Sequence, residues 1–81
     1  MIAHLKGQLT YKSPEHAIID VNGVGYQVFT PLSTYYALPS IGQTVSLRVH
    51  TRVREDEFKL FGFLTEEEQY ILQKLITINK V

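Results

Sequence analysis

The chain has 81 residues, of which eight are basic and eight acidic, so its formal net charge at pH 7 is zero with neutral histidines. This length indicates one domain, since domains rarely fall much below about 50 residues. Zero net charge excludes a general attraction to nucleic acid, so such binding must come from uneven charge distribution. The sequence contains no cysteine, which excludes disulfides and thiolate chemistry. Because it has no membrane-length apolar run and no signal-peptide core, we expect a soluble, cytoplasmic domain.

The first half of the chain has the two-residue period of half-buried β-strands. Residues 2–12 alternate between apolar and polar side chains, and Gly7 within them indicates a bend or bulge that lets one strand serve both ends of a small barrel. Asn22 and Gly23 lie between two further alternating runs, and both tolerate the positive φ of a type I′ turn. A two-residue turn there places three cross-strand pairs on one face: Val21–Val24, Ile19–Tyr26 and Ala17–Val28.

Residues 30–42 break this alternation. Thr30 is suited to cap a short helical turn and Pro31 to begin it, while Pro39 and Gly42 end it. We expect the larger side chains of this turn to plug one end of the barrel, namely Tyr35, Tyr36 and Leu38. The alternative is that the tyrosines are exposed and stack on nucleic acid bases.

A long alternating run over residues 43–54 predicts a strand that forms a hairpin with residues 57–63. With Glu55 and Asp56 as its loop, the hairpin has a defined register: Arg54–Glu57, Val53–Phe58, Arg52–Lys59 and Thr51–Leu60. One face of the first strand is then apolar, formed by Val45, Leu47, Val49, Thr51 and Val53. Basic side chains share the other face: Arg48, Arg52 and Arg54, with Lys59 beside them.

The acidic loop of this hairpin needs an explanation, because tight two-residue turns favour Asn-Gly or Asp-Gly. The simplest interpretation of Glu55 and Asp56 is a solvated polar loop. The other is that the two residues are present for their charge.

Residues 64–81 have the pattern of an amphipathic helix. Thr65 and Glu68 fit a capping box, and acids in the first turn favour the helix dipole. An apolar stripe follows at helical spacing, formed by Ile71, Leu72, Leu75 and Ile76. The sequence thus predicts a mainly β fold, with an OB-fold-like barrel of five to six strands over residues 1–63 and a packing C-terminal α-helix over residues 64–81.

No motif in the sequence points to catalysis or to a cofactor. The three histidines are scattered without cysteine partners, so we expect no metal site. The glycines of "NGVGY" belong to a hairpin and not to a phosphate-binding loop. Three acids at the second hairpin, Glu55, Asp56 and Glu57, resemble a metal-binding loop only weakly. We therefore expect a non-enzymatic domain without cofactors.

Four segments resemble the bacterial RuvA family of Holliday junction branch-migration proteins: "MIAHLKG", "VNGVGYQV", "VREDEFKLFGF" and "EEEQYILQKLITIN". Their order and spacing match the N-terminal domain of that family over essentially all 81 residues. The resemblance implies a domain that recognises four-way junction DNA in recombination and repair, within a homotetramer. It further implies that Glu55 and Asp56 form the acidic pin at the centre of the crossover, where their charge repels phosphates.

The charge balance of such a pin can be estimated. A carboxylate about 6 Å from a phosphate, at an effective dielectric constant near 20, is repelled by roughly 2–3 kcal/mol before salt screening. Attraction must then come from nearby cations, for which the candidates are Arg48, Arg52, Arg54 and Lys59. Equally, these cations can form ion pairs with Glu57 and its neighbours. His50 is interpreted as a surface histidine, and the role of Glu57 stays open.

The resemblance also implies parts beyond this chain. Family members continue into a helix-hairpin-helix domain that binds the duplex arms and a third domain that docks on the hexameric ATPase motor RuvB, and they work with the junction nuclease RuvC. Val81 is therefore expected to end a fragment. Two alternatives stay open: a single-strand-binding OB domain using Phe61 and Phe63 as exposed aromatics, and a purely structural oligomerisation module.

Overall fold

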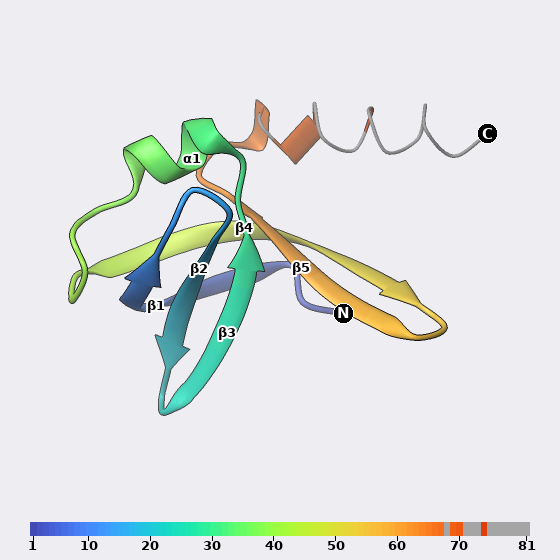
Figure 1. Cartoon of the computed structure of the whole chain (residues 1–81), viewed down its shortest axis with the longest axis horizontal. Helices are drawn as coiled ribbons and strands as arrows, with labels where there is room; N and C mark the ends of the chain where they lie inside the picture. The colour runs from blue at the N-terminus through green and yellow to red at the C-terminus, as the bar shows by residue number, and fades with distance from the viewer. Residues whose placement is uncertain (68, 71–73, 75–81) are drawn as a thin grey trace.

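The computed structural model describes residues 1–67, 69–70 and 74. Within them the strands form a closed barrel in the order β1-β2-β3-β5-β4, with one short helix between β3 and β4 (Figure 1). The elements are β1 (His4–Lys12), β2 (His16–Val21), β3 (Val24–Phe29), α1 (Leu32–Ala37), β4 (Thr44–Arg54) and β5 (Glu57–Phe63). This confirms the predicted mainly β, OB-fold-like barrel, with five strands in the described part. No helix among the described residues is long and apolar enough to cross a membrane.

The first strand closes the barrel because it pairs with two neighbours. Its first half pairs antiparallel with β4 and its second half with β2. The bulge predicted at Gly7 lies instead between Leu9 and Tyr11, where the register with β2 shifts. Gly7 has a different role: a Cβ atom there would overlap the backbone carbonyl oxygen of Asp20. The missing side chain therefore permits the close approach of β2 at the point where β1 changes partners.

The β2–β3 hairpin has the predicted register, from Val21–Val24 through Ala17–Val28. Asn22 has φ 53° and Gly23 has φ 90°, as a type I′ turn requires. The Asp20 carboxylate accepts a hydrogen bond from the Gly23 N–H at 2.8 Å. The face that these pairs share leaves the core at the turn, where Val24 is exposed because the hairpin extends past the core.

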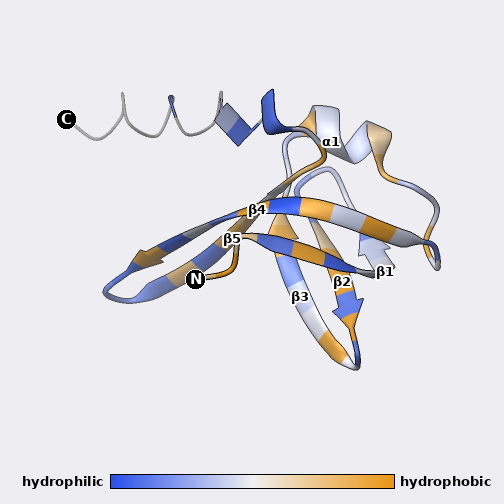
Figure 2. Ribbon diagram, turned by 180° about the vertical axis from the view of Figure 1, so that it is seen from behind, coloured by the Kyte–Doolittle hydropathy of each residue, from blue (hydrophilic) through white to orange (hydrophobic). Residues whose placement is uncertain are grey.

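The barrel core consists of aliphatic side chains from all five strands and from the end of α1. Hydrophobic and hydrophilic residues alternate along the ribbons of the strands (Figure 2), as the two-residue period predicts. The buried members of this cluster are Leu5, Leu9, Ala17, Ile19, Val28, Leu38, Val45, Leu47, Val49 and Leu60.

Helix α1 differs in two respects from the prediction. Pro31, and not Thr30, is the N-cap residue, and no side chain caps the helix. Thr34 is fully buried and Leu38 is buried as predicted, whereas Tyr36 is 75% exposed. Residues four apart share one face of a helix, so Thr34 and Leu38 face the barrel and Tyr36 lies away from it. The prediction that the side chain plugs the end of the barrel is thus confirmed for Leu38 and wrong for Tyr36.

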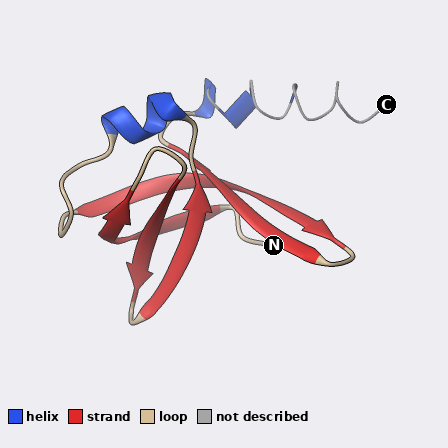
Figure 3. Ribbon diagram, viewed as in Figure 1, coloured by secondary structure: helices blue, strands red, loops and turns tan. Residues whose placement is uncertain are grey.

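The chain leaves β5 into a helical segment of which residues 66–67, 69–70 and 74 are described (Figure 3). The Gln69 N–H donates to the Thr65 carbonyl at 3.4 Å, the spacing of an α-helical turn. Glu68 of the predicted capping box lies outside the described residues. So does the apolar stripe of Ile71, Leu72, Leu75 and Ile76. The division into a barrel over residues 1–63 and a packing helix over 64–81 stays a prediction.

Candidate nucleic-acid interface

The β4–β5 hairpin projects beyond the body of the barrel (Figure 1). Its register is the predicted one, with Arg54 opposite Glu57 and two residues in the loop. Thr51 and Leu60 are the last buried pair, whereas Val53 is 66% exposed and Phe58 is 61% exposed. Val53 continues the predicted apolar face of β4 but is exposed, because the hairpin extends beyond the barrel that would cover it.

The loop places two carboxylates at the outermost point of the hairpin. Glu55 and Asp56 are both exposed. Asn22 is the one non-glycine residue with positive φ in the described chain, so neither acid adopts the left-handed conformation of a type I′ turn. The backbone of this loop thus does not require Asn or Gly. Neither carboxylate has a hydrogen-bond or ion-pair partner among the described residues, so both charges face solvent.

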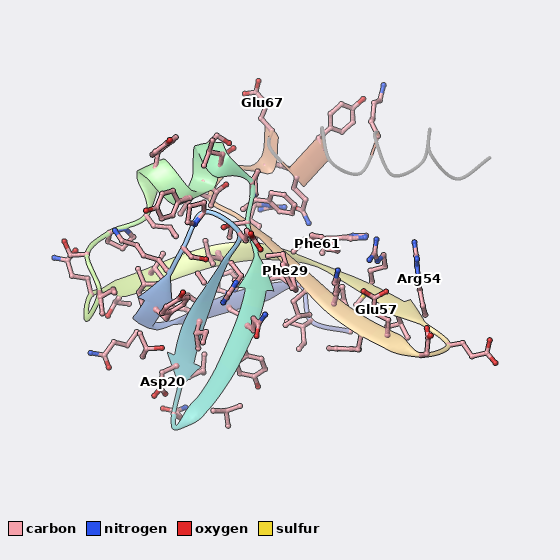
Figure 4. All side chains as sticks on the ribbon, in the orientation of Figure 1. Asp20, Phe29, Arg54, Glu57, Phe61 and Glu67 are labelled. Atoms are coloured by element: carbon pink, nitrogen blue, oxygen red, sulfur yellow. The ribbon has the colours of Figure 1, made fainter. Side chains whose placement is uncertain are left out.

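The four predicted cations lie on the outer face of the hairpin and differ in their contacts. Arg48 Nε donates to the Gln69 side chain at 2.9 Å, and Arg48 Nη2 lies 4.0 Å from the Glu66 carboxylate. Arg54 is exposed and has no ion-pair partner among the described residues (Figure 4). Arg48 is thus tied to the helical segment, and Arg54 is available to an external anion.

Arg52 and Lys59 share one carboxylate oxygen. Glu57 Oε1 lies 3.3 Å from Arg52 Nη2 and 3.2 Å from Lys59 Nζ. The hydrogen bond from Lys59 and the positive charges of both cations hold the pKa of the Glu57 carboxyl below its ordinary value. Glu57 therefore belongs to the flank of the hairpin, and its environment separates it from the two acids of the loop.

A row of aromatic rings crosses the outer surface of the barrel, which sequence reasoning missed. Neighbouring ring centroids lie 5.2, 6.0, 6.2 and 6.4 Å apart. In order along the row the residues are Tyr11, His16, Phe29, Phe61 and His50. Each occupies an outward position of its strand, so the signal was present in the alternation, but the order depends on which strands become neighbours.

The two phenylalanines of this row support the cations. Arg52 Cζ lies 5.2 Å from the centroid of the Phe61 ring, and Lys59 Nζ lies 4.8 Å from that of Phe29. Stacking on nucleic acid bases requires open aromatic faces, and these two faces carry cations. Phe63 is only 1% exposed. The alternative of single-strand binding through Phe61 and Phe63 is therefore wrong for Phe63 and unsupported for Phe61.

Metal ligands do not gather in the part of the chain that the structure describes, where no group of three or more histidine, aspartate or glutamate side chains could hold an ion. The side chains of the hairpin instead define a charged surface. Two exposed carboxylates lie at its tip, and four cations lie along its outer flank, two of which share the carboxylate of Glu57.

A closed five-stranded barrel with a projecting, charged hairpin defines a small OB-like β-barrel domain of the kind that binds other macromolecules through its surface. Residues 1–62 match the family model described as the RuvA N-terminal domain. The chain therefore belongs to the family of RuvA N-terminal domains.

Relatives resemble this chain over its entire length. Proteins named Holliday junction branch migration complex subunit RuvA are 56% identical to it in Geobacter sp. (strain M21) and in Geobacter sulfurreducens, and 52% identical in Syntrophobacter fumaroxidans. Each comparison covers all 81 residues of this chain and 41% of the relative. The chain thus spans about two fifths of the length of these relatives.

Proposed function

We propose that this chain is the domain of a RuvA subunit that recognises Holliday junctions, and that the tip of the β4–β5 hairpin is its acidic pin. The observation that carries the proposal is the position of Glu55 and Asp56. Both acids lie at the end of a hairpin that extends past the barrel, and both are exposed and unpaired within the described chain. The family supports the proposal, because its members include subunits of the Holliday junction branch migration complex.

The chemistry of the pin is repulsion. A phosphate about 6 Å from either carboxylate is repelled by roughly 2–3 kcal/mol at an effective dielectric constant near 20. In a homotetramer, eight such carboxylates surround the axis and keep strands from collapsing into the crossover. The junction then stays open, so that its arms can exchange base pairs.

Attraction comes from the flank of the same hairpin and from parts of the subunit outside this chain. Arg54 is the best placed of the four cations, because it is exposed, unpaired among described residues and adjacent to the pin. Arg48 contributes less, since Gln69 and Glu66 already hold it. We therefore expect isolated residues 1–81 to bind junctions far more weakly than a full-length subunit, because they make fewer phosphate contacts. Each lost contact lowers the slope of the logarithm of the binding constant against the logarithm of salt concentration by about one unit.

The domain is a non-catalytic part of this assembly. ATP hydrolysis belongs to the RuvB motor and strand cleavage to the RuvC nuclease, and the duplex arms bind to a helix-hairpin-helix domain beyond this chain.

The exposed pair Val53 and Phe58 gives the hairpin an apolar surface suited to contact between subunits of the tetramer. The complex works in the bacterial cytoplasm.

The test is charge reversal of the pin in the full-length subunit. Replacing Glu55 and Asp56 together with lysine should tighten DNA binding and reduce the preference for junction over linear duplex at least tenfold at low salt, which corresponds to about 1.4 kcal/mol. The neutral pair Glu55→Gln and Asp56→Asn should give an intermediate preference, because it removes repulsion without adding attraction.

A matched control carries the same change of charge away from the hairpin. Glu15 and Glu67 are exposed acids outside it, and their double replacement with lysine should tighten both DNA forms alike. Affinities for a four-way junction and a duplex of equal length are measured across a salt series, with the tetramer checked by light scattering. If replacing Glu55 and Asp56 with lysine left the ratio of junction affinity to duplex affinity unchanged, the tip would be only a solvated loop.

A further inference from the structure

The flank of the β4–β5 hairpin holds an arrangement that the pin does not use. A single oxygen atom, Glu57 Oε1, lies within hydrogen-bond distance of both Arg52 and Lys59, at 3.3 Å and 3.2 Å. The oxygens of a phosphodiester are also anionic acceptors, and they pair with the same two cations. Glu57 Oε1 therefore marks a position at which a phosphate oxygen would meet two donors at once.

The two cations are positioned by more than this carboxylate. Arg52 lies over the ring of Phe61, and Lys59 lies over the ring of Phe29, whose centroid is 6.2 Å from that of Phe61. Cation–π contact holds each charge against the barrel without consuming its hydrogen-bond donors. Figure 4 shows Phe29 and Phe61 next to each other where the hairpin leaves the barrel. The pair of cations therefore keeps its spacing when Glu57 turns away.

We propose that Arg52 and Lys59 form an anion seat on the outer flank of the hairpin, that Glu57 masks it, and that its ligand is a backbone phosphate of DNA. The inference rests on the proposed function, since it assumes that the hairpin approaches a junction. Arg54 lies directly opposite Glu57 and is exposed on the same face, so a strand that contacts Arg54 reaches the seat next.

The ion pairs of Glu57 are weak enough for a phosphate to replace its carboxylate between Arg52 and Lys59. The side chains of Arg52, Glu57 and Lys59 are 25%, 31% and 36% exposed, so water screens their ion pairs and weakens them. The lowered pKa of Glu57 agrees with a position that favours negative charge. A mask of this kind makes the flank a poor site for random duplex, while a phosphate held nearby by the rest of the subunit can displace the glutamate.

The mask predicts a gain of affinity on neutralisation. Glu57→Gln in the full-length subunit should bind linear duplex more tightly, with a salt dependence steeper by about one unit for one added phosphate contact. Its advantage over the parent should therefore fall about three- to fourfold between 50 and 200 mM salt. Glu57→Ala should give the same gain, because the effect depends on loss of the carboxylate. Adding Arg52→Gln and Lys59→Gln to Glu57→Gln should return the slope to the parent value or below.

The control is Glu15→Gln, which changes net charge equally on the loop between β1 and β2. Thermal unfolding of every variant confirms the fold. The inference is overturned if Glu57→Gln gains no more affinity for duplex than Glu15→Gln does, or if the salt slope of its binding is unchanged. It is also overturned if Glu57→Gln binds duplex more weakly than the parent, because Glu57 would then be a positioning residue for the cations. A parent protein without preference for junctions would contradict the proposed function, whereas a parent with that preference and no gain in Glu57→Gln would contradict this inference alone.

Discussion

Replacement of Gly7 with alanine should be among the most damaging single-methyl changes in this barrel. The added Cβ would overlap the backbone carbonyl oxygen of Asp20 and lie 3.0 Å from both the Asp20 carbonyl carbon and Val21 Cγ2. A flexible side chain could turn aside, but the Asp20 backbone is held by its pairing with Gln8 in β1 and with Gly25 in β3. The two strands must therefore separate where β1 passes from one partner to the other.

The cost follows from this geometry. Overpacking typically destabilises a protein by about 1–3 kcal/mol, and the rigid partner places Gly7→Ala in the upper half of that range. For a domain of this size each kcal/mol lowers Tm by about 4–8 °C, so we expect a fall of roughly 10–20 °C. Circular dichroism of the 81-residue chain during heating measures it, with urea unfolding as an independent value of the free energy.

Gly25→Ala is the matched control for this experiment. A Cβ at Gly25 would meet only Ile18 Cγ2, at an ordinary contact distance of 3.4 Å. Its free energy of unfolding should therefore stay within about 0.5 kcal/mol of the parent. If Gly7→Ala were as stable as Gly25→Ala, the close approach of β1 and β2 would not limit the size of this residue, and the explanation of Gly7 would fail.

Three further variants test other parts of the structure. Leu47→Ala removes a fully buried side chain from the barrel centre and should cost about 2–5 kcal/mol in urea unfolding. Asn22→Val places a β-branched residue at φ 53° and should cost about 1–3 kcal/mol by the same assay. Lys59 lowers the pKa of the Glu57 carboxyl, so ionised Glu57 should make the parent more stable than Glu57→Gln. This difference in stability should be present above the ordinary pKa of 4.5 and disappear as pH falls through the lowered value. Equal differences in Tm between the two proteins at pH 7 and at pH 2 would contradict this.

The registers of both hairpins could be predicted from the sequence because each is determined locally. Asn22 and Gly23 define one turn, and the alternation on either side of Glu55 and Asp56 leaves a single register for the other. A shift by one residue would turn every apolar side chain outward, so few arrangements compete. The cation stripe on β4 follows from the same alternation.

The extent of burial and the contacts between distant strands could not be predicted in this way. Alternation assigns Val53 to the inward face but contains no information on where the barrel ends. The row of rings depends on the parallel pairing of Phe29 with Phe61, which joins segments separated by more than thirty residues. The shared carboxylate depends on rotamers, since Glu57 lies opposite Arg54 in register yet its side chain reaches diagonally to Arg52.

Under the proposed function, the hairpin explains how a chain with no net charge can act on DNA through charge. Between residues 52 and 59 three cations and three acids cancel, but the strands separate them in space. The loop carries two unpaired negative charges, and the flank carries Arg54 together with a triad, of net charge +1, in which Glu57 offsets one of two cations. If the hairpin contacts DNA as proposed, such a surface has little general attraction for duplex and instead orients a phosphate backbone away from the tip and toward the flank. Under the proposed function and the inferred role of Glu57, discrimination between a junction and a duplex therefore depends on where each acid lies in the hairpin: Glu55 and Asp56 repel strands from the crossover, and Glu57 limits binding beside it.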